Sequence, residues 1–218
     1  MSNITIVLAA DTGYAEQVHT LMKSVCTHNT NVDFYLMHNT FRREWIDYTN
    51  QKLAASGNRL NDVKIEVDFS QYRRLSHISD AAFFRLMMQH LPVDRALYLD
   101  SDMVVTQSLH DLFNLDMRGY PVAAVQDSVL VRTEWEHPID LHTTPYFNSG
   151  MLLADLAQWR EHNIAEQLLK TAACLNEAVP YGDQCFLNTV FRKSWLELNE
   201  SWNFQTGAVE YFQKRNLS

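Results

Sequence analysis

The chain has 218 residues, of which 46% are hydrophobic and 20% are charged, with six Gly and five Pro. This composition can bury a large core and is unlike that of disordered segments. The formal net charge of −8 excludes a general nucleic-acid-binding surface, so we expect no nucleic-acid partner. A metal ion or a helix N-terminus can still neutralise a nucleotide phosphate locally.

The sulfur and imidazole residues give no sign of a structural metal or a disulfide framework. Cys26, Cys174 and Cys185 form no C-x-x-C pattern, and the nine His show no zinc-type spacing. No apolar run approaches the roughly 20 residues that cross a bilayer, and no signal peptide begins the chain. These features predict reduced cysteines and a cytoplasmic protein.

The first half of the chain alternates strand-like and helix-like segments. A continuous apolar run predicts a strand at 4–10, and the spacing of Val18, Leu21, Met22 and Val25 predicts the helix after it. The following patterns predict a strand at 32–37, a helix at about 42–55, an alternating strand at 63–69, a buried helix at 81–91 and a strand at 95–99. This rhythm predicts an α/β fold with a Rossmann-like, mostly parallel sheet and helices on both faces.

The second half changes character. Between Val104 and Asn148 the signals are short and interrupted by Gly and Pro, so we expect an insertion or mobile loop there. An apolar strand is predicted at 147–153, and Asp155 with Gln158 and Asn163 with Glu166 resemble capping boxes that start two helices. Without a linker or repeat, residues 1–218 are predicted to form one domain.

The stretch LYLDSDMVV, residues 97–105, places two carboxylates between apolar runs. A buried unpaired carboxylate is costly, so Asp100 and Asp102 are expected at a strand end, beside a cation, or both. In extended backbone they project to one side and can bind one divalent ion while Ser101 turns away. A chain with 15 Asp contains about one D-x-D by chance, so an acidic loop is the simpler interpretation until context is added.

Three polar interruptions follow predicted strands, at 9–14, 100–102 and 126–127. In a doubly wound sheet, ligands bind beyond the carboxyl ends of strands, where the strand order switches. Asp11 can accept from a base or a ribose, and Tyr14 is either a stacking face or a core aromatic. Neither G-x-G-x-x-G nor G-K-[ST] is present, so a nucleotide site here must rely on metal and side chains.

Six stretches carry a family resemblance. They read IVLAADTGY (6–14), HISDAAFFRLMM (77–88), RALYLDSDMVV (95–105), AAVQD (123–127), YFNSGMLLADLAQWR (146–160) and YGDQCFLN (181–188). In this order they resemble the retaining glycosyltransferases of family 8, which have the mixed, mostly parallel GT-A fold. The family includes bacterial lipooligosaccharide galactosyltransferases, general stress protein A-type proteins and glycogenin. D-x-D alone is a weak signal, but its spacing to F-N-S-G-x-L-L and D-Q-x-x-L-N is specific.

The resemblance implies a site for a UDP-sugar donor and a metal ion, Mn²⁺ or Mg²⁺. Its donor-binding positions correspond to Ala9, Ala10, Asp11, Tyr14, Arg85, Asp100, Ser101 and Asp102, of which Asp100 and Asp102 bind the metal. The catalytic group around the donor sugar corresponds to Asp127, Asn148, Asp183 and Gln184. Gln184 is implied to lie below the anomeric carbon, and Asp183 contacts sugar hydroxyls or, alternatively, is only a helix N-cap.

The implied reaction is Mn²⁺-dependent transfer of galactose or glucose, with retention, to a saccharide acceptor such as lipopolysaccharide or lipooligosaccharide. Nothing after Gln205 matches the family's H-x-x-G-x-x-K-P-W segment, which supplies a third metal ligand, or its basic and aromatic tail. We therefore expect weakened metal binding, and peripheral membrane association only through that missing tail. The alternative is a catalytically impaired module that binds a UDP-sugar or a partner.

Overall fold

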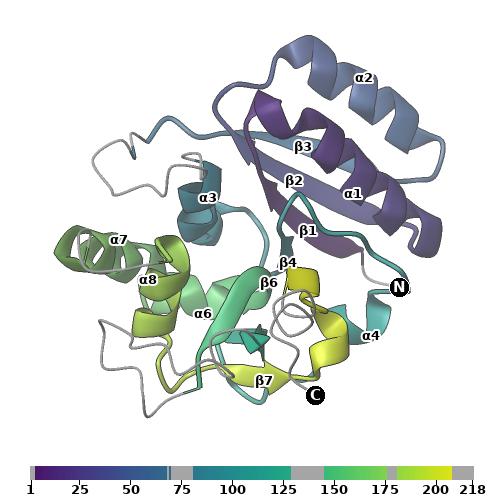
Figure 1. Ribbon diagram of the computed structural model, residues 1–218. Helices are drawn as coiled ribbons and strands as arrows, with labels where there is room; N and C mark the ends of the chain where they lie inside the picture. The colour runs from purple at the N-terminus through teal and green to yellow at the C-terminus, as the bar shows by residue number, and fades with distance from the viewer. Residues whose placement is uncertain (1–2, 68, 70–80, 129–144, 176–180, 208–218) are drawn as a thin grey trace.

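The computed structural model describes residues 3–67, 69, 81–128, 145–175 and 181–207, and within them seven strands form one sheet (Figure 1). The strands, in chain order, are β1 Ile4–Ala9, β2 Val32–His38, β3 Arg59–Lys64, β4 Arg95–Leu99, β5 Val122–Gln126, β6 Phe147–Asp155 and β7 Leu196–Leu198. Their order across the sheet is β3-β2-β1-β4-β6-β5-β7.

Only β6 among these strands runs against its neighbours, because it pairs antiparallel with both β4 and β5. The other pairings, β1 with β2 and β4, β2 with β3, and β5 with β7, are parallel. The predicted mixed and mostly parallel sheet is confirmed. Strand order reverses beside β1, which has β2 on one side and β4 on the other.

Helices cover both faces of the sheet (Figure 1). One face carries α1 Ala15–His28, α2 Arg43–Ala54 and α4 His110–Phe113, and the other carries α3 Ala81–Phe84, α6 Leu156–Glu161, α7 Ile164–Leu175 and α8 Asp183–Val190. Alternate residues of each central strand enter opposite cores: Ile6 and Leu8 pack with the first set of helices, and Val7 and Ala9 with the second. Three short 3-10 turns complete the fold: η1 Thr12–Tyr14, η2 Arg85–His90 and η3 Glu200–Trp202.

Several local predictions are confirmed. The four apolar residues spaced along α1 are all buried, and β1, β2, β4 and β6 lie where their patterns indicate. Asp155 caps α6 by accepting from the backbone N–H of Gln158 at 3.0 Å, and the Gln158 side chain donates to the other carboxylate oxygen at 2.9 Å. Local hydrophobic period and cap chemistry are therefore sufficient to locate these elements.

The strand predicted at 63–69 is wrong in position, because β3 occupies Arg59–Lys64. Its residues pair one for one with Asp33 to His38 of β2. Arg59 Nη2 donates to Asp33 Oδ2 at 2.9 Å, and the Asn58 side chain accepts from the N–H of Val32 at 2.8 Å. These contacts with β2 start β3 directly after the turn, before the alternating pattern begins.

The helix predicted at 81–91 and the loop predicted at 104–148 also need correction. After one α-helical turn the chain continues as the 3-10 turn η2, and Leu91 is extended, as expected before Pro92. In the second segment, α4 and the buried strand β5 are regular, since β5 is enclosed between β6 and β7. The rest of that prediction, 129–144, lies outside the described residues, as do His77 to Asp80 of the second family-like stretch.

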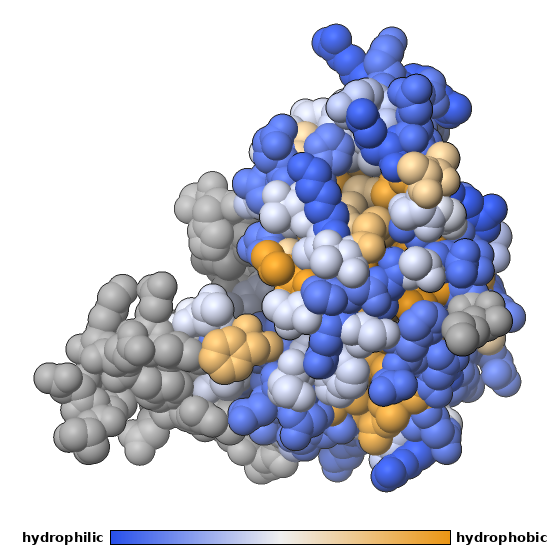
Figure 2. All heavy atoms as spheres, turned by 90° about the vertical axis from the view of Figure 1, so that its right-hand side faces the viewer, coloured by the Kyte–Doolittle hydropathy of each residue, from blue (hydrophilic) through white to orange (hydrophobic). Residues whose placement is uncertain are grey.

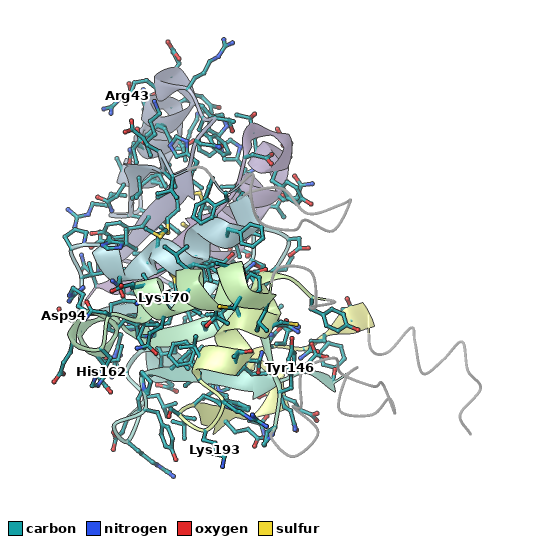
Figure 3. The ribbon with its side chains drawn as sticks, turned by 90° about the vertical axis from the view of Figure 1, so that its left-hand side faces the viewer. Arg43, Asp94, Tyr146, His162, Lys170 and Lys193 are labelled. Atoms are coloured by element: carbon teal, nitrogen blue, oxygen red, sulfur yellow. The ribbon has the colours of Figure 1, made fainter. Side chains whose placement is uncertain are left out.

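The exterior in Figure 2 is mostly hydrophilic, with hydrophobic residues confined to narrow areas between polar ones. Among the helices in the described part of the chain, none has the length and apolar character needed to cross a membrane.

Candidate functional site

A cavity of about 430 Å³ lies where the parallel strands β1, β4 and β5 end and β6 begins. All the predicted site residues except Asp11 line it. The complete lining is Ala9, Ala10, Tyr14, Ala81, Ala82, Arg85, Tyr98, Asp100, Ser101, Asp102, Asp127, Asn148, Ser149, Tyr181, Asp183 and Gln184. Residues far apart in the sequence thus meet at the switch in strand order, where an open α/β sheet binds its ligands.

At the β1 end of the cavity, Asp11 has a local structural contact. Its carboxylate accepts from the backbone N–H of Gly13 at 2.8 Å and caps η1, and it is absent from the cavity lining. Tyr14 lines the cavity with 39% of its surface exposed, so it is not a core aromatic. Its accessible ring favours the stacking alternative.

The acidic motif is a turn rather than the extended strand that its i, i+2 geometry suggested. The last ladder contact is Asp100 N–H to Gly150 O at 2.7 Å, and Met103 N–H then donates to Asp100 O at 3.2 Å. Ser101 does not turn away, because it is buried against β1 and donates to Ala9 O at 3.1 Å. The carboxylates of Asp100 and Asp102 nevertheless border the same cavity, and Asp102 is exposed.

Arg85 connects the acidic turn to the helical layer. Its guanidinium Nη2 lies 2.9 Å from Asp100 Oδ1 and its Nε lies 2.9 Å from Asp183 Oδ2. A further nitrogen, Nη1, donates to Ser149 O at 2.7 Å. Burial alone lowers the pKa of Arg85, but the charges of Asp100 and Asp183 outweigh it and hold this pKa above its usual range. Arg85 is therefore a fixed positive charge at the centre of the site.

Tyr98 is a site residue that the sequence analysis missed. Its hydroxyl donates to Asp100 Oδ1 at 2.8 Å, and the Arg85 guanidinium lies 4.5 Å from the centre of its ring. Its position two residues before Asp100, near the end of β4, was the available signal. Ala81, Ala82, Ser149 and Tyr181 were also missed, although all four lie inside the family-like stretches.

Asp127 and two amide side chains form the opposite wall. Gln184 Nε2 and Asn148 Nδ2 both donate to Asp127 Oδ2, at 3.1 and 3.3 Å. Gln184 Oε1 accepts from the N–H of Ser149 at 3.0 Å, and Asn148 Oδ1 accepts from the N–H of Gly150 at 3.0 Å. Because a backbone N–H can only donate, these contacts fix the orientation of both amides and hold their nitrogens toward Asp127.

Two glycines permit this packing. A Cβ at Gly150 would lie 3.0 Å from both Asn148 Oδ1 and Asp100 Oδ2, so glycine lets the two walls approach each other. Gly182 has a φ of +51°, which suits glycine, and it precedes α8, the helix that carries Asp183 and Gln184.

The N-cap alternative for Asp183 is wrong, because Gly182 is the N-cap and Asp183 is the first helical residue. Its carboxylate is buried beside Arg85, but the Arg85 Nε–H donates to Ala82 O. Among the described residues Asp183 Oδ2 therefore has an ion-pair partner in Arg85 but accepts no hydrogen bond.

Asp183 gives a testable pH dependence. Burial, opposed by the nearby charge of Arg85, raises the pKa of Asp183 from 3.8 to about 6. Between those values the folded state holds this proton more tightly than the unfolded state, so its contribution to stability falls as pH rises from about 4 to about 6. We expect urea unfolding of the ligand-free wild type to lose on the order of 2–3 kcal/mol over this window relative to Asp183→Asn. An identical pH dependence in both proteins would contradict this assignment.

The described part of the cavity offers two candidate metal ligands, Asp100 and Asp102. Among the described residues no three His, Cys, Asp or Glu side chains group closely enough to hold a metal ion. Partial burial and then the charge of Asp100 raise the pKa of Asp102, and the charge of Arg85 opposes this shift. Two hard carboxylate ligands fit Mg²⁺ or Mn²⁺, provided that further oxygen ligands come from elsewhere.

Comparisons with known proteins agree with this arrangement. The model of glycosyl transferase family 8 matches residues 5–217. Glycosyltransferase GlyF of Streptococcus pneumoniae serotype 4 is 38% identical over 209 residues, covering 95% of this chain and 50% of GlyF. The crystal structure of GlyE from S. pneumoniae TIGR4 matches with a TM-score of 0.81 and 29% identity, over 99% of this chain and 50% of GlyE.

A second solved structure is the galactosyltransferase LgtC in complex with donor and acceptor sugar analogues. It matches with a TM-score of 0.88 and 26% identity, over 99% of this chain and 80% of LgtC. The chain spans half or less of curated relatives such as GlyF, GlyA and GlyB.

Proposed function

This chain belongs to glycosyltransferase family 8, and on that premise we propose that it transfers galactose or glucose from a UDP-sugar to a saccharide acceptor with retention of configuration. The observation that carries the proposal is the convergence of an acidic turn, a buried arginine and an amide-flanked carboxylate on one cavity. Glycan acceptors such as lipopolysaccharide or lipooligosaccharide are the class we propose.

The two ends of the cavity suit the two parts of the donor. Tyr14 offers an accessible ring, and the carboxyl end of β1 offers backbone groups, for a nucleoside. Asp127, Asp183 and the two amides offer acceptors and donors for sugar hydroxyls. Asp100 and Asp102 would hold a divalent cation, which when bound supplies Lewis-acid stabilisation of the leaving diphosphate.

The geometry also bears on the retaining mechanism. Gln184 is a neutral amide whose Oε1 already accepts from the backbone N–H and the hydroxyl of Ser149, at 3.0 and 3.3 Å. It is therefore poorly suited to attack the anomeric carbon. Asp127 brings a buried negative charge to this wall, which stabilises positive charge developing on the sugar. We propose attack by the acceptor on the face that the diphosphate leaves, with the leaving phosphate taking the acceptor proton.

The test is release of sugar from UDP-glucose and UDP-galactose by the purified chain, with and without Mn²⁺. We expect slow, Mn²⁺-stimulated hydrolysis of one donor, in which water takes the place of the acceptor. Absence of sugar release and of nucleotide binding would overturn the proposal.

One observation favours a second candidate, a UDP-sugar-binding module with impaired turnover. In the described part of the chain the acidic pair lacks a third acidic, His or Cys metal ligand. Tight binding of UDP or a UDP-sugar with no sugar release at any Mn²⁺ concentration would support this alternative over the enzyme.

Replacing Gln184 with alanine separates catalysis from nucleotide binding. Loss of its Nε2 contact to Asp127 and its Oε1 contacts to Ser149 loosens the wall beside the sugar. We expect kcat for donor hydrolysis to fall about tenfold to hundredfold, with the Kd for UDP changed less than twofold. Calorimetry and hydrolysis assays measure the two quantities, and a wild-type kcat would contradict the assigned role.

A further inference from the structure

Gln205 holds the segment around Asp127 from outside the cavity. Its Nε2 donates to Gln126 O at 3.0 Å, and its Oε1 accepts from both the backbone N–H and the hydroxyl of Ser128, each at 3.0 Å. The side chain therefore bonds to the residues immediately before and after Asp127. Gln205 lies beyond the last family-like stretch, and the sequence analysis gave it no role.

Asn203, two residues before Gln205, bonds to Asn148, which lines the cavity beside Asp127. It is buried, and its Nδ2 donates to Asn148 Oδ1 at 3.0 Å. Asn148 in turn donates to Asp127 Oδ2 at 3.3 Å. Asn203 and Gln205 thus reach Asp127 by two routes, one through the Asn148 side chain and one through the backbone.

The segment that carries these two amides is itself anchored. Asn199 caps η3 by accepting from the N–H of Ser201 at 3.0 Å. Trp202 packs against the core between the sheet and the helices α1, α2 and α4. Just before it, Leu198 of β7 pairs with Val125 of β5, one residue from Gln126. The two amides therefore project from a fixed backbone, as positioning a reactive group requires.

We propose that Asn203 and Gln205 form an amide clamp that positions Asp127 and Asn148 against the sugar of the donor. The inference rests on the proposed function and extends it to residues outside the cavity lining. The hydrogen bonds of the two amides go to Gln126, Ser128 and Asn148, so we expect the effect of the clamp at the sugar end. Asn203 and Gln205 are positioning residues, since they act through Asp127 and Asn148.

The clamp is tested with Gln205→Met, which keeps the side-chain length and removes all three hydrogen bonds, and with Asn203→Ala. The matched control is Gln107→Met, because Gln107 is an exposed glutamine on the groove that Asn203 and Gln205 also line. We expect kcat for donor hydrolysis to fall about tenfold to hundredfold in the clamp variants, with the Kd for UDP within twofold of wild type. The control should keep the wild-type kcat.

A merely structural role predicts a different result, in which UDP binding and kcat fall together with the melting temperature. That result, or a wild-type kcat in both clamp variants, would overturn the clamp. If Gln205→Met does not fold, Gln205→Glu replaces it, since it keeps the acceptor for Ser128 and loses only the donor to Gln126.

Hydrogen exchange gives a readout that does not depend on turnover. Peptides covering 122–128 should exchange faster in Gln205→Met than in wild type or Gln107→Met, because Ser128 N–H and the Gln126 carbonyl lose their partner. Unchanged exchange would overturn the clamp. A wild type that releases no sugar would overturn the proposed activity, and the exchange result would then decide the clamp separately.

Discussion

Replacing Arg85 with methionine is expected to lower the free energy of unfolding by about 3–5 kcal/mol, as for removal of one partner from a buried ion pair. The guanidinium is almost completely enclosed and serves Asp100 and Asp183 together. Without it, two carboxylates share a poorly solvated site with no opposing charge. Urea unfolding at neutral pH measures the loss.

The control for Arg85→Met is Arg59→Met. The side chain of Arg59 is 62% exposed and pairs with Asp33 at the edge of the sheet, so its loss should cost less than about 1 kcal/mol. Similar losses in the two variants would mean that Arg85 is not a buried electrostatic centre.

The Arg85→Met defect should also depend on pH in a defined direction. Removing the cation takes away the charge that opposes the raised pKa of Asp183, so the folded-state pKa of this group rises further above its unfolded value. The folded variant then binds protons more strongly than the unfolded chain, so the defect shrinks in acid and grows toward neutrality. A second substitution, Asp183→Asn, should recover part of the lost stability at neutral pH by removing one unpaired charge. No recovery would contradict the pairing.

Asp102→Asn is expected to weaken Mn²⁺-dependent UDP binding by about a hundredfold or more. Loss of a residue that only supports a metal ligand costs about 10–100-fold, and loss of a ligand should reach at least the upper end. Asp102 is exposed and belongs to the turn, so the melting temperature should not change. Calorimetric titration of UDP with and without Mn²⁺ measures the effect.

Asp100→Asn should show the same loss of binding together with lower stability. Asp100 accepts from Tyr98 and pairs with Arg85, so it serves the fold as well as the cation. Asp111→Asn, an exposed carboxylate on α4, is the control and should bind normally. Unaltered Mn²⁺-dependent affinity in both motif variants would remove the metal role.

Local pattern was sufficient for the elements whose stability is local. The four apolar positions of α1 face one core, and the runs that became β1 and β4 are buried on both faces, so period and composition alone identified them. The order of the polar interruptions at 9–14, 100–102 and 126–127 also predicted that their side chains meet, because the ends of parallel strands share one edge. Most of the cavity lining followed from the predicted elements, the order of the polar interruptions and the family resemblance.

Pairing between distant segments decided the rest. The position of β3 depends on two contacts with β2, the Arg59 side chain with Asp33 and the Asn58 side chain with the N–H of Val32. The alternating pattern at 63–69 carries no information about these contacts. The ion pairs of Arg85 and the amide clamp of Asn203 and Gln205 likewise join residues that only the folded sheet brings together. A hydrophobic period reports which face of an element is buried, whereas a hydrogen bond or ion pair depends on what lies opposite that face. The sequence therefore determined the elements with a clear local pattern and the edge where the site lies, and the tertiary structure alone determined which side chains hold one another there.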